Sequence, residues 1–305
     1  MKRQSKTRAE AEAKAERRAP REARREKQRA ENAGRAARMH KARLEWEREA
    51  RGAKPKADPT KGSDCHVGCS GWFYWHWRGN FYPATLPTNK WFPYYARRFA
   101  TVELNAPFYS WPTVGTVRSW VRQATRRKFV YTVKASELIT HIKKFSGTKT
   151  LIRDFGHIAD LLGPRMGCFL FQLPPSFHYS PARLRRIVEQ LDPSRRNVVE
   201  FRHATWWNAK VYAAFRAAGI IFCSCSGPRL PDELITTSED IYLRFHGTKQ
   251  WYQHNYTTAE LEKWRDRIRA SGAKRVWAYF NNDRNGYAIQ NALALRRLLQ
   301  GKKSS

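Results

Sequence analysis

The chain has 305 residues and a formal net charge of +32, from 58 Lys and Arg against 26 Asp and Glu. This length allows one large domain with a substantial core, and such a charge indicates a polyanionic partner such as nucleic acid, or an RNA-rich setting. No run of about eighteen apolar residues is present, which excludes a predicted transmembrane helix. We therefore expect no membrane partner, and the sequence leaves the oligomeric state open.

Residues 1–62 form a segment of low complexity that is rich in Ala, Arg, Lys and Glu. It holds 21 basic and 10 acidic residues, and few large apolar side chains apart from Leu44 and Trp46. Such a segment has little apolar surface to bury, so we expect a basic disordered or intermittently helical N-terminal extension, with Pro20 interrupting any long helix. It is either a solvated charged tail or an arm that binds a polyanion. The folded domain is expected at residues 63–305.

Beyond residue 63, short apolar runs with a preference for β-structure alternate with segments of helical periodicity. Strands are expected at about residues 65–70, 101–105, 128–134, 166–173, 197–202, 219–225, 241–246 and 275–281. Helices are expected at Pro181–Leu191, Trp206–Ala218, Ala259–Ala270 and Tyr287–Leu299. This alternation predicts an α/β fold, a (β/α)8 TIM-like barrel, with an open doubly wound sheet as the alternative. The Pro-rich stretch 226–240 is too short for a full helix.

Polar and apolar side chains alternate within the expected strands. Glu103 lies between Val102 and Leu104, and the same pattern surrounds Glu200 and Arg244. Because successive side chains of a strand point to opposite faces, the polar ones are expected to face the barrel axis and the apolar ones the helices. They also lie near the C-terminal ends of their strands, where barrel enzymes carry the active site. The alternative is a structural ion-pair network that fills the barrel.

A series of motifs, in this order, resembles the YecE-like family, also called domain of unknown function 72, from about residue 65 to residue 299. They include Val67-Gly68-Cys69-Ser70-Gly71-Trp72, Thr101-Val102-Glu103-Leu104-Asn105, Phe171-Gln172-Leu173-Pro174-Pro175, Val199-Glu200-Phe201-Arg202-His203, Arg244-Phe245-His246-Gly247 and Tyr279-Phe280-Asn281-Asn282-Asp283. The resemblance implies a TIM barrel and is compatible with nucleic-acid binding or processing. Family members often carry Asp near the end of the sixth strand, where this chain has Cys225-Ser226.

The residues expected at the mouth of the barrel suggest both chemistry and binding. The candidate catalytic residues are Glu103, Lys134, Glu200 and His246. Two carboxylates can divide acid and base roles, and a desolvated lysine beside arginines can act as a base or Schiff-base nucleophile. The candidate ligand-binding residues are Trp72, Asn105, Tyr109, His141, Gln172, Arg202, Trp206, Arg244, Asn281 and Asp283. The cationic surplus favours phosphate or carboxylate, and aromatic rings among cations suit a nucleic-acid strand or a sugar.

Our leading hypothesis is a barrel that binds a phosphate-bearing anionic ligand, with nucleic acid as the favoured partner, and that is a candidate hydrolase of the phosphodiesterase or nuclease type. The alternatives are a non-catalytic nucleic-acid-binding or scaffold protein, and an enzyme acting on a sugar or carboxylate small molecule. Interleaved cationic side chains argue against a constitutive metal, and the cofactor is left open. Five cysteines in apolar strand-like runs, with no apparent signal peptide, indicate a reducing cytoplasm.

Overall fold

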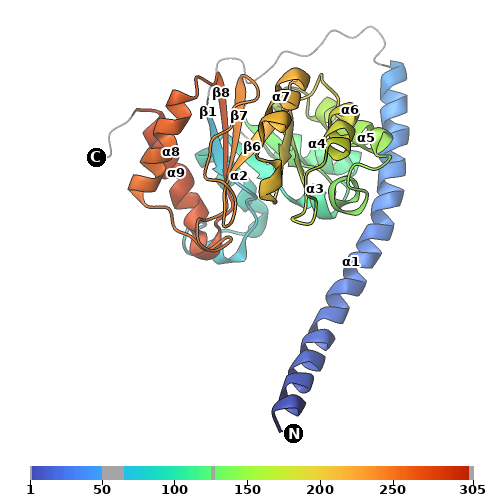
Figure 1. The fold of residues 1–305 in the computed structure, drawn as a ribbon, viewed down its shortest axis with the longest axis vertical. Helices are drawn as coiled ribbons and strands as arrows, with labels where there is room; N and C mark the ends of the chain where they lie inside the picture. The colour runs from blue at the N-terminus through green and yellow to red at the C-terminus, as the bar shows by residue number, and fades with distance from the viewer. Residues whose placement is uncertain (1, 50–64, 125–127, 302–305) are drawn as a thin grey trace.

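The computed structural model describes residues 2–49, 65–124 and 128–301 (Figure 1). Eight parallel strands form one sheet in the order β1-β8-β7-β6-β5-β4-β3-β2. A parallel bridge between Ser70 and Glu103 joins the two outermost strands, so the sheet is nearly closed into a barrel. The predicted (β/α)8 TIM-like barrel is confirmed, and the open doubly wound sheet was the wrong alternative.

The observed elements follow the predicted order along the chain. The strands are β1 (Cys65–Cys69), β2 (Thr101–Leu104), β3 (Val130–Lys134), β4 (Met166–Gln172), β5 (Asn197–Glu200), β6 (Ile221–Ser226), β7 (Asp240–Phe245) and β8 (Arg275–Phe280). The barrel helices are α2 (Trp91–Arg98), α3 (Ala106–Tyr109), α4 (Val114–Gln123), α5 (Lys149–Leu162), α6 (Pro181–Gln190), α7 (Ala209–Ala218), α8 (Thr258–Ala270) and α9 (Tyr287–Leu299). α7 begins at Ala209 rather than Trp206 because Asn208 Oδ1 caps it, accepting a hydrogen bond from Val211 N at 3.1 Å. Residues 227–239 contain no helix, as expected.

The alternation within the strands separates two apolar clusters. Outward-facing residues such as Val102, Leu104 and Phe245 pack with the helices in the main core. Inward-facing residues fill the barrel itself: Val130, Cys168, Leu170, Val198, Ile221, Cys223, Cys225, Tyr242, Trp277 and Tyr279. The predicted parity is therefore confirmed around Glu103, Glu200 and Arg244, and these charged residues lie toward the C-terminal end of the inner cluster. No helix in the described part of the chain has the length and apolarity needed to cross a bilayer.

A glycine allows β1 and β2 to approach closely enough to close the sheet. A Cβ atom on Gly68 would lie 2.6 Å from the carbonyl oxygen of Thr101, so no other residue fits without displacing backbone. Tyr95 holds the same junction, since its hydroxyl accepts from Cys69 N and donates to Thr101 O, each at 3.0 Å. This closure places Ser70 and Glu103 side by side at the mouth.

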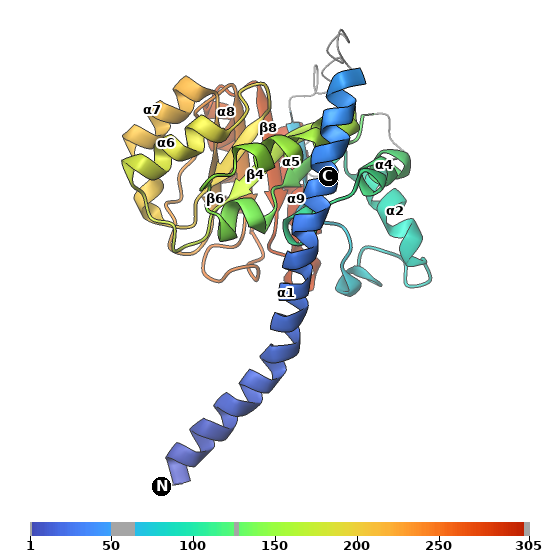
Figure 2. The ribbon, with the colours of Figure 1, turned by 90° about the vertical axis from the view of Figure 1, so that its right-hand side faces the viewer.

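The N-terminal extension is a single helix, α1 (Lys2–Glu49), which continues through Pro20. The expectation that Pro20 interrupts the helix was wrong: a proline removes one backbone hydrogen bond, and flanking turns rich in Ala, Glu and Arg sustain the helix. The predicted domain boundary at residue 62 lies outside the described residues. Figures 1 and 2 show the second half of α1 running alongside α5 and the first half extending away from the barrel.

Polar side chains attach α1 to the barrel. Asn32 donates to Tyr109 O at 2.9 Å and accepts from Trp111 N at 2.8 Å, and Arg43 Nε lies 2.8 Å from Asp154 Oδ1. Asn32 and Arg43 are both buried. Since Asn32 contacts the segment after β2, at the mouth, and Arg43 contacts the middle of α5, the residues before Asn32 extend beyond the mouth side of the barrel.

Candidate functional site at the barrel mouth

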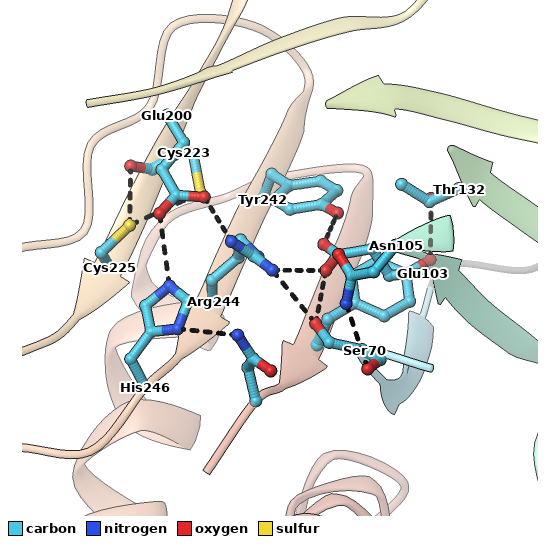
Figure 3. Close-up of polar contacts among 12 residues, drawn as sticks. Ser70, Glu103, Asn105, Thr132, Glu200, Cys223, Cys225, Tyr242, Arg244 and His246 are labelled. Carbon is cyan, nitrogen blue, oxygen red and sulfur yellow. Dashed lines mark hydrogen bonds and ion pairs between the residues drawn. The ribbon is translucent and has the colours of Figure 1, made fainter. Parts of the chain in front are cut away.

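Arg244, on β7, lies at the centre of a buried ion-pair network (Figure 3). Its Nη2 is 2.6 Å from Glu103 Oε1, and its Nη1 is 2.6 Å from Glu200 Oε2. All three side chains are at most 1% exposed. Burial alone would lower the pKa of Arg244, but the two carboxylates hold it well above its usual value. The guanidinium thus joins β2, β5 and β7 across the barrel interior.

Glu103 is held on its other sides by two hydroxyl groups. Tyr242 donates to Oε2 at 2.5 Å, and Ser70 donates a short hydrogen bond to Oε1. Ser70 Oγ in turn accepts from Arg244 Nη2 at 3.2 Å. Both Glu103 oxygens therefore have donors within the protein, and the carboxylate is fully buried.

Glu200 is shared among Arg244, Arg202 and His246. Its Oε1 forms a close ion pair with Arg202 Nε and lies 3.3 Å from His246 Nε2. Burial would raise the pKa of the Glu200 carboxyl, but Arg202 and Arg244 hold it well below its usual range. Burial and the same two arginines hold the pKa of His246 well below 6.5, so its imidazole is neutral at pH 7.

Arg202 lies between this network and the solvent. Its side chain is 9% exposed, and its Nη2 lies 3.1 Å from His246 Nε2. The guanidinium carbon lies over the Trp251 ring, 4.5 Å from its centroid, which is a cation–π contact. Within the described residues, Arg202 Nη1 makes no hydrogen bond. Arg202 can therefore offer a donor to a ligand without leaving Glu200.

Lys134, the last residue of β3, is a cation of the mouth without an anionic partner among the described residues. The residue is 9% exposed, and its Nζ lies 4.0 Å from the centroid of the Phe108 ring. In the part of the chain that the structure describes, Nζ makes no hydrogen bond and no ion pair. Burial, and after it the charge of Arg244, lower the pKa of the amine to about 7.

The rim of the mouth carries exposed aromatic and apolar side chains. Phe73 and Trp75 follow β1, Tyr109 follows β2, Ile142 follows β3 and Tyr252 follows β7; they are 50%, 63%, 50%, 45% and 44% exposed. Most exposed large apolar side chains of the described chain thus lie on loops at the C-terminal ends of strands. Such clustering on one face is typical of a binding surface.

Similarity to known proteins identifies the family of this barrel. Residues 66–305 match the family described as Protein of unknown function DUF72. The chain belongs to the DUF72 family. UPF0759 protein YunF of Bacillus subtilis (strain 168) is 26% identical over 275 residues, which cover 77% of this chain and 94% of YunF.

Two solved structures agree with this assignment. The crystal structure of a DUF72 family protein from Thermotoga maritima MSB8 has 28% identity and a TM-score of 0.71, and the match covers 78% of this chain and 99% of that one. A DUF72 family protein from Enterococcus faecalis V583 has 18% identity and a TM-score of 0.67, covering 79% of this chain and 97% of that one. This second likeness supports the fold alone. Helix α1 lies outside the DUF72 match.

The DUF72 barrel brings most of the predicted site residues together. Besides the ion-pair network and Lys134, Asn281 Nδ2 lies 3.4 Å from His246 Nδ1, and Asn105 Nδ2 donates to Ser70 O at 3.2 Å. Gln172 is buried at the end of β4 and donates to Leu173 O at 2.8 Å. His141 lies beside Lys134, and Tyr109 stands on the rim.

Three predicted ligand-binding residues have other surroundings. Trp206 is fully buried, stacks on Phe201 at 4.0 Å and donates to a backbone carbonyl, so it belongs to the core and does not reach the mouth. Trp72 is partly buried and packs against Phe92. Asp283, in the loop after β8, accepts from Trp77 Nε1 at 2.7 Å, and its Oδ2 lies 2.7 Å from His76 Nε2; burial outweighs both contacts and raises its pKa to about 6.

The sequence prediction missed several residues that position the site in this DUF72 protein. Tyr242 precedes Arg244 by two residues, so strand parity alone places it on the same inward face. Ser70 lies within a motif that was recognised but was not assigned a role. Phe108 and Trp251, which contact Lys134 and Arg202, were not among the named candidates. No pattern in the sequence indicates which cation each ring contacts.

One group of residues has the composition of a metal site. Ligand atoms of Glu200, Cys225 and His246 lie within 4.8 Å of one another, and all three residues are buried. Arg202 and Arg244 already pair with the Glu200 carboxylate, so a divalent cation would stand beside two guanidinium groups. The donor set therefore does not fit a resident metal.

Proposed function

We propose that this DUF72 barrel binds a phosphate-bearing anionic ligand at its C-terminal mouth, with Lys134 and Arg202 as the cationic contacts. The observation that supports this most directly is the Lys134 amine, which is nearly buried without any acceptor in the described residues. A buried ammonium normally pairs with a carboxylate, because transfer from water is costly. An anionic ligand would supply the missing partner.

The charges of the network favour this interpretation. The carboxylates of Glu103 and Glu200 are balanced by the guanidinium groups of Arg202 and Arg244. Lys134 is therefore an additional positive charge when it is protonated. Arg202 has a free Nη1 donor in the same region, and a planar guanidinium suits phosphate oxygens.

The predicted acid and base roles of Glu103 and Glu200 stay a prediction, as does hydrolysis. Both carboxylates are fully buried and accept from several donors, which favours a positioning role. In that role they would fix Arg244 and orient Arg202 toward the ligand. The binding proposal does not require that either glutamate transfers a proton.

Calorimetric titration with inorganic phosphate and pyrophosphate tests the binding site. We expect Lys134→Met and Arg202→Gln each to weaken binding at least tenfold, since each removes a charged contact worth about 1.5–3 kcal/mol. Lys274→Met is the matched control, because Lys274 is 69% exposed and precedes β8, at the opposite end of the barrel. Binding should weaken above pH 7 as Lys134 loses its proton. Unchanged affinity in both variants would exclude the proposal.

A single-stranded nucleic acid is a second candidate ligand, favoured by the aromatic rim and by α1. Bases stack on exposed rings while cations hold the backbone. Residues 1–28 carry 11 basic and 5 acidic residues, and this part of α1 extends beyond the mouth side. The helix thus lies where a strand bound at the rim would continue.

Fluorescence anisotropy with a labelled single strand at several salt concentrations tests this candidate. Replacing exposed Arg24, Arg25 and Lys27 with Gln should reduce the slope of log K against log salt by about 2, from three lost phosphate contacts. Trp75→Ala should weaken binding by about 1–3 kcal/mol, whereas Leu44→Ala serves as the exposed apolar control. An unchanged salt slope and an unchanged affinity for Trp75→Ala would exclude a nucleic-acid ligand at this surface.

A further inference from the structure

We propose that Lys134 is a catalytic amine, which forms an imine with an aldehyde or ketone group of the ligand bound at the mouth. This inference rests on the proposed function only for the phosphate contact at Arg202: the protonated Lys134 pairs with an anion, and the unprotonated Lys134 reacts with the carbonyl group. It assigns a reaction class, amine–carbonyl condensation, and a substrate class, a phosphorylated carbonyl compound.

The first support is the isolation of the Lys134 amine. Lys134 stands at the C-terminal end of β3, where barrel enzymes place catalytic groups. Both buried carboxylates of the mouth are occupied by arginines, so neither holds the amine as an ion pair. An imine-forming lysine requires this situation, because a carboxylate partner would keep the amine protonated.

The electrostatic surroundings support the same role. The Phe108 face favours the ammonium form. Burial and the positive charges of Arg244 and Arg202 oppose it more strongly, and the pKa of Lys134 falls to about 7. Near neutral pH, about half of the molecules therefore carry a free amine lone pair, whereas an ordinary lysine would be almost fully protonated.

His141 is placed to carry the protons that the reaction requires. Its ring packs against Phe108 in a T-shaped arrangement with centroids 4.8 Å apart, while Lys134 lies over the same phenyl ring. Its Nδ1 lies 2.9 Å from Thr140 Oγ1, and Nε2 makes no hydrogen bond within the described chain. Burial, and then Lys134, lower its pKa to about 4, so the imidazole is neutral at pH 7 and can accept a proton.

The reaction balances without any further reactant. The Lys134 nitrogen attacks the carbonyl carbon and a C–N bond forms, while the carbonyl oxygen gains a proton and becomes a hydroxyl. The nitrogen loses one proton as the carbinolamine forms and its second as the C=N bond forms, while the hydroxyl gains a proton and leaves as water. The oxygen thus receives both protons that the nitrogen gives up, and a neutral imine remains. His141 would accept the proton from nitrogen and return it to the departing oxygen. No electron is gained or lost, so no oxidant or reductant is required.

Borohydride trapping on the full chain tests the proposal with pyridoxal phosphate as the probe, an aldehyde that carries a phosphate. Reduction converts an imine into a stable secondary amine, which peptide mass spectrometry assigns to a residue. We expect an adduct at Lys134 in the wild type and in Lys274→Met. In Lys134→Met, the summed adduct that mass spectrometry assigns to lysines at the barrel mouth should fall at least tenfold. The rate of labelling should rise with pH to a plateau with a midpoint near 7. His141→Asn should slow labelling about 100-fold without changing its stoichiometry.

Two natural forms of the ligand are compared in separate arms. Glyceraldehyde 3-phosphate represents a free phosphorylated aldehyde, and an oligonucleotide with an abasic site represents an aldehyde within a nucleic-acid strand. An adduct at Lys134 with either probe supports the inference and names the source. If pyridoxal phosphate labels only other lysines, or labels Lys134 with a midpoint near 10, the inference is overturned.

The phosphate titration separates this inference from the proposed function. If phosphate binding depends on Arg202 while no probe is trapped at Lys134, the imine is overturned and the anion site stands. If Lys134 is trapped although phosphate neither binds nor competes, the amine stands and the phosphate contact fails. Circular dichroism of Lys134→Met confirms that lost labelling does not reflect unfolding.

Discussion

Arg244 Nη2 lies 2.6 Å from Glu103 Oε1, and this ion pair ties β7 to β2 across the interior of the barrel. The same guanidinium reaches Glu200 at 2.6 Å, so one side chain neutralises parts of two buried carboxylates. Removing it would leave both carboxylates without their shared cation in a region that excludes water. The network is therefore more sensitive to loss of Arg244 than to loss of a surface ion pair.

Arg244→Met should reduce the free energy of unfolding by about 3–5 kcal/mol, because it leaves buried carboxylates uncompensated. Urea denaturation followed by circular dichroism measures the change. Arg185→Met on the exposed face of α6 is the control and should change stability by less than about 0.5 kcal/mol. A loss below about 1 kcal/mol would show that the network is not a coupled unit.

Lys134→Met should stabilise the protein near pH 7. The folded-state pKa of Lys134 is about 7, against 10.5 ordinarily, so between these pH values the unfolded chain binds a proton at Lys134 that the folded chain does not bind. This proton lowers the free energy of unfolding; the effect is absent above pH 10.5 and grows as pH falls toward 7. We expect a gain of about 2–4 kcal/mol at pH 7, measured by urea denaturation. Lys274→Met should show no such gain, and a loss of stability in Lys134→Met would contradict this assignment.

Gly68→Ala should destabilise the barrel by about 2–3 kcal/mol, because the new methyl group collides with the Thr101 carbonyl where β1 meets β2. Gly156→Ala is the matched control in α5, where a Cβ atom meets nothing within 4 Å. That second change should stabilise the helix by about 0.5–1 kcal/mol. Thermal denaturation measures the change in melting temperature of both variants. Equal changes would show that the close approach of Gly68 to the Thr101 carbonyl has no special role in closing the sheet.

Asp283 should make stability fall as pH rises from 4 to 6. Burial raises its folded-state pKa to about 6, against 3.8 ordinarily, so the folded chain holds a proton that the unfolded chain releases in this window. The contribution of the Asp283 carboxyl to the free energy of unfolding is fully present below pH 3.8 and is lost as pH rises through 6. The difference between wild type and Asp283→Asn should change by roughly 2–3 kcal/mol across the window, measured by urea denaturation at each pH. A constant difference would mean that the carboxyl is not desolvated.

The fold and much of the site follow from local patterns. The alternation around Glu103, Glu200 and Arg244 fixes which side chains face the axis, since the period of a strand is two residues. Trp206 was misassigned because the turn after β5, rather than strand parity, directs its ring onto Phe201. The isolation of Lys134 was also beyond a sequence argument, because it depends on which carboxylates the two arginines engage in three dimensions.

The attachment of α1 was equally hidden from sequence patterns. Its buried positions include the polar Asn32 and Arg43 beside the apolar Ala36 and Met39, so the apolar part of this face is small. The partners of Asn32 and Arg43, a backbone segment at Tyr109–Trp111 and the carboxylate of Asp154, come together only in the folded barrel. Hydrophobic periodicity detects apolar faces, and it gives only a weak signal for a helix whose buried face combines polar groups with few apolar side chains.

The position of these partners along the chain has a consequence for biosynthesis. The contacts described for α1 involve residues from Tyr109 to His157, and none of these belongs to β4 or to a later strand. During translation, α1 can therefore form these contacts before β4 to β8 leave the ribosome. α1 would then already be packed on α5 while the second half of the barrel is still being made.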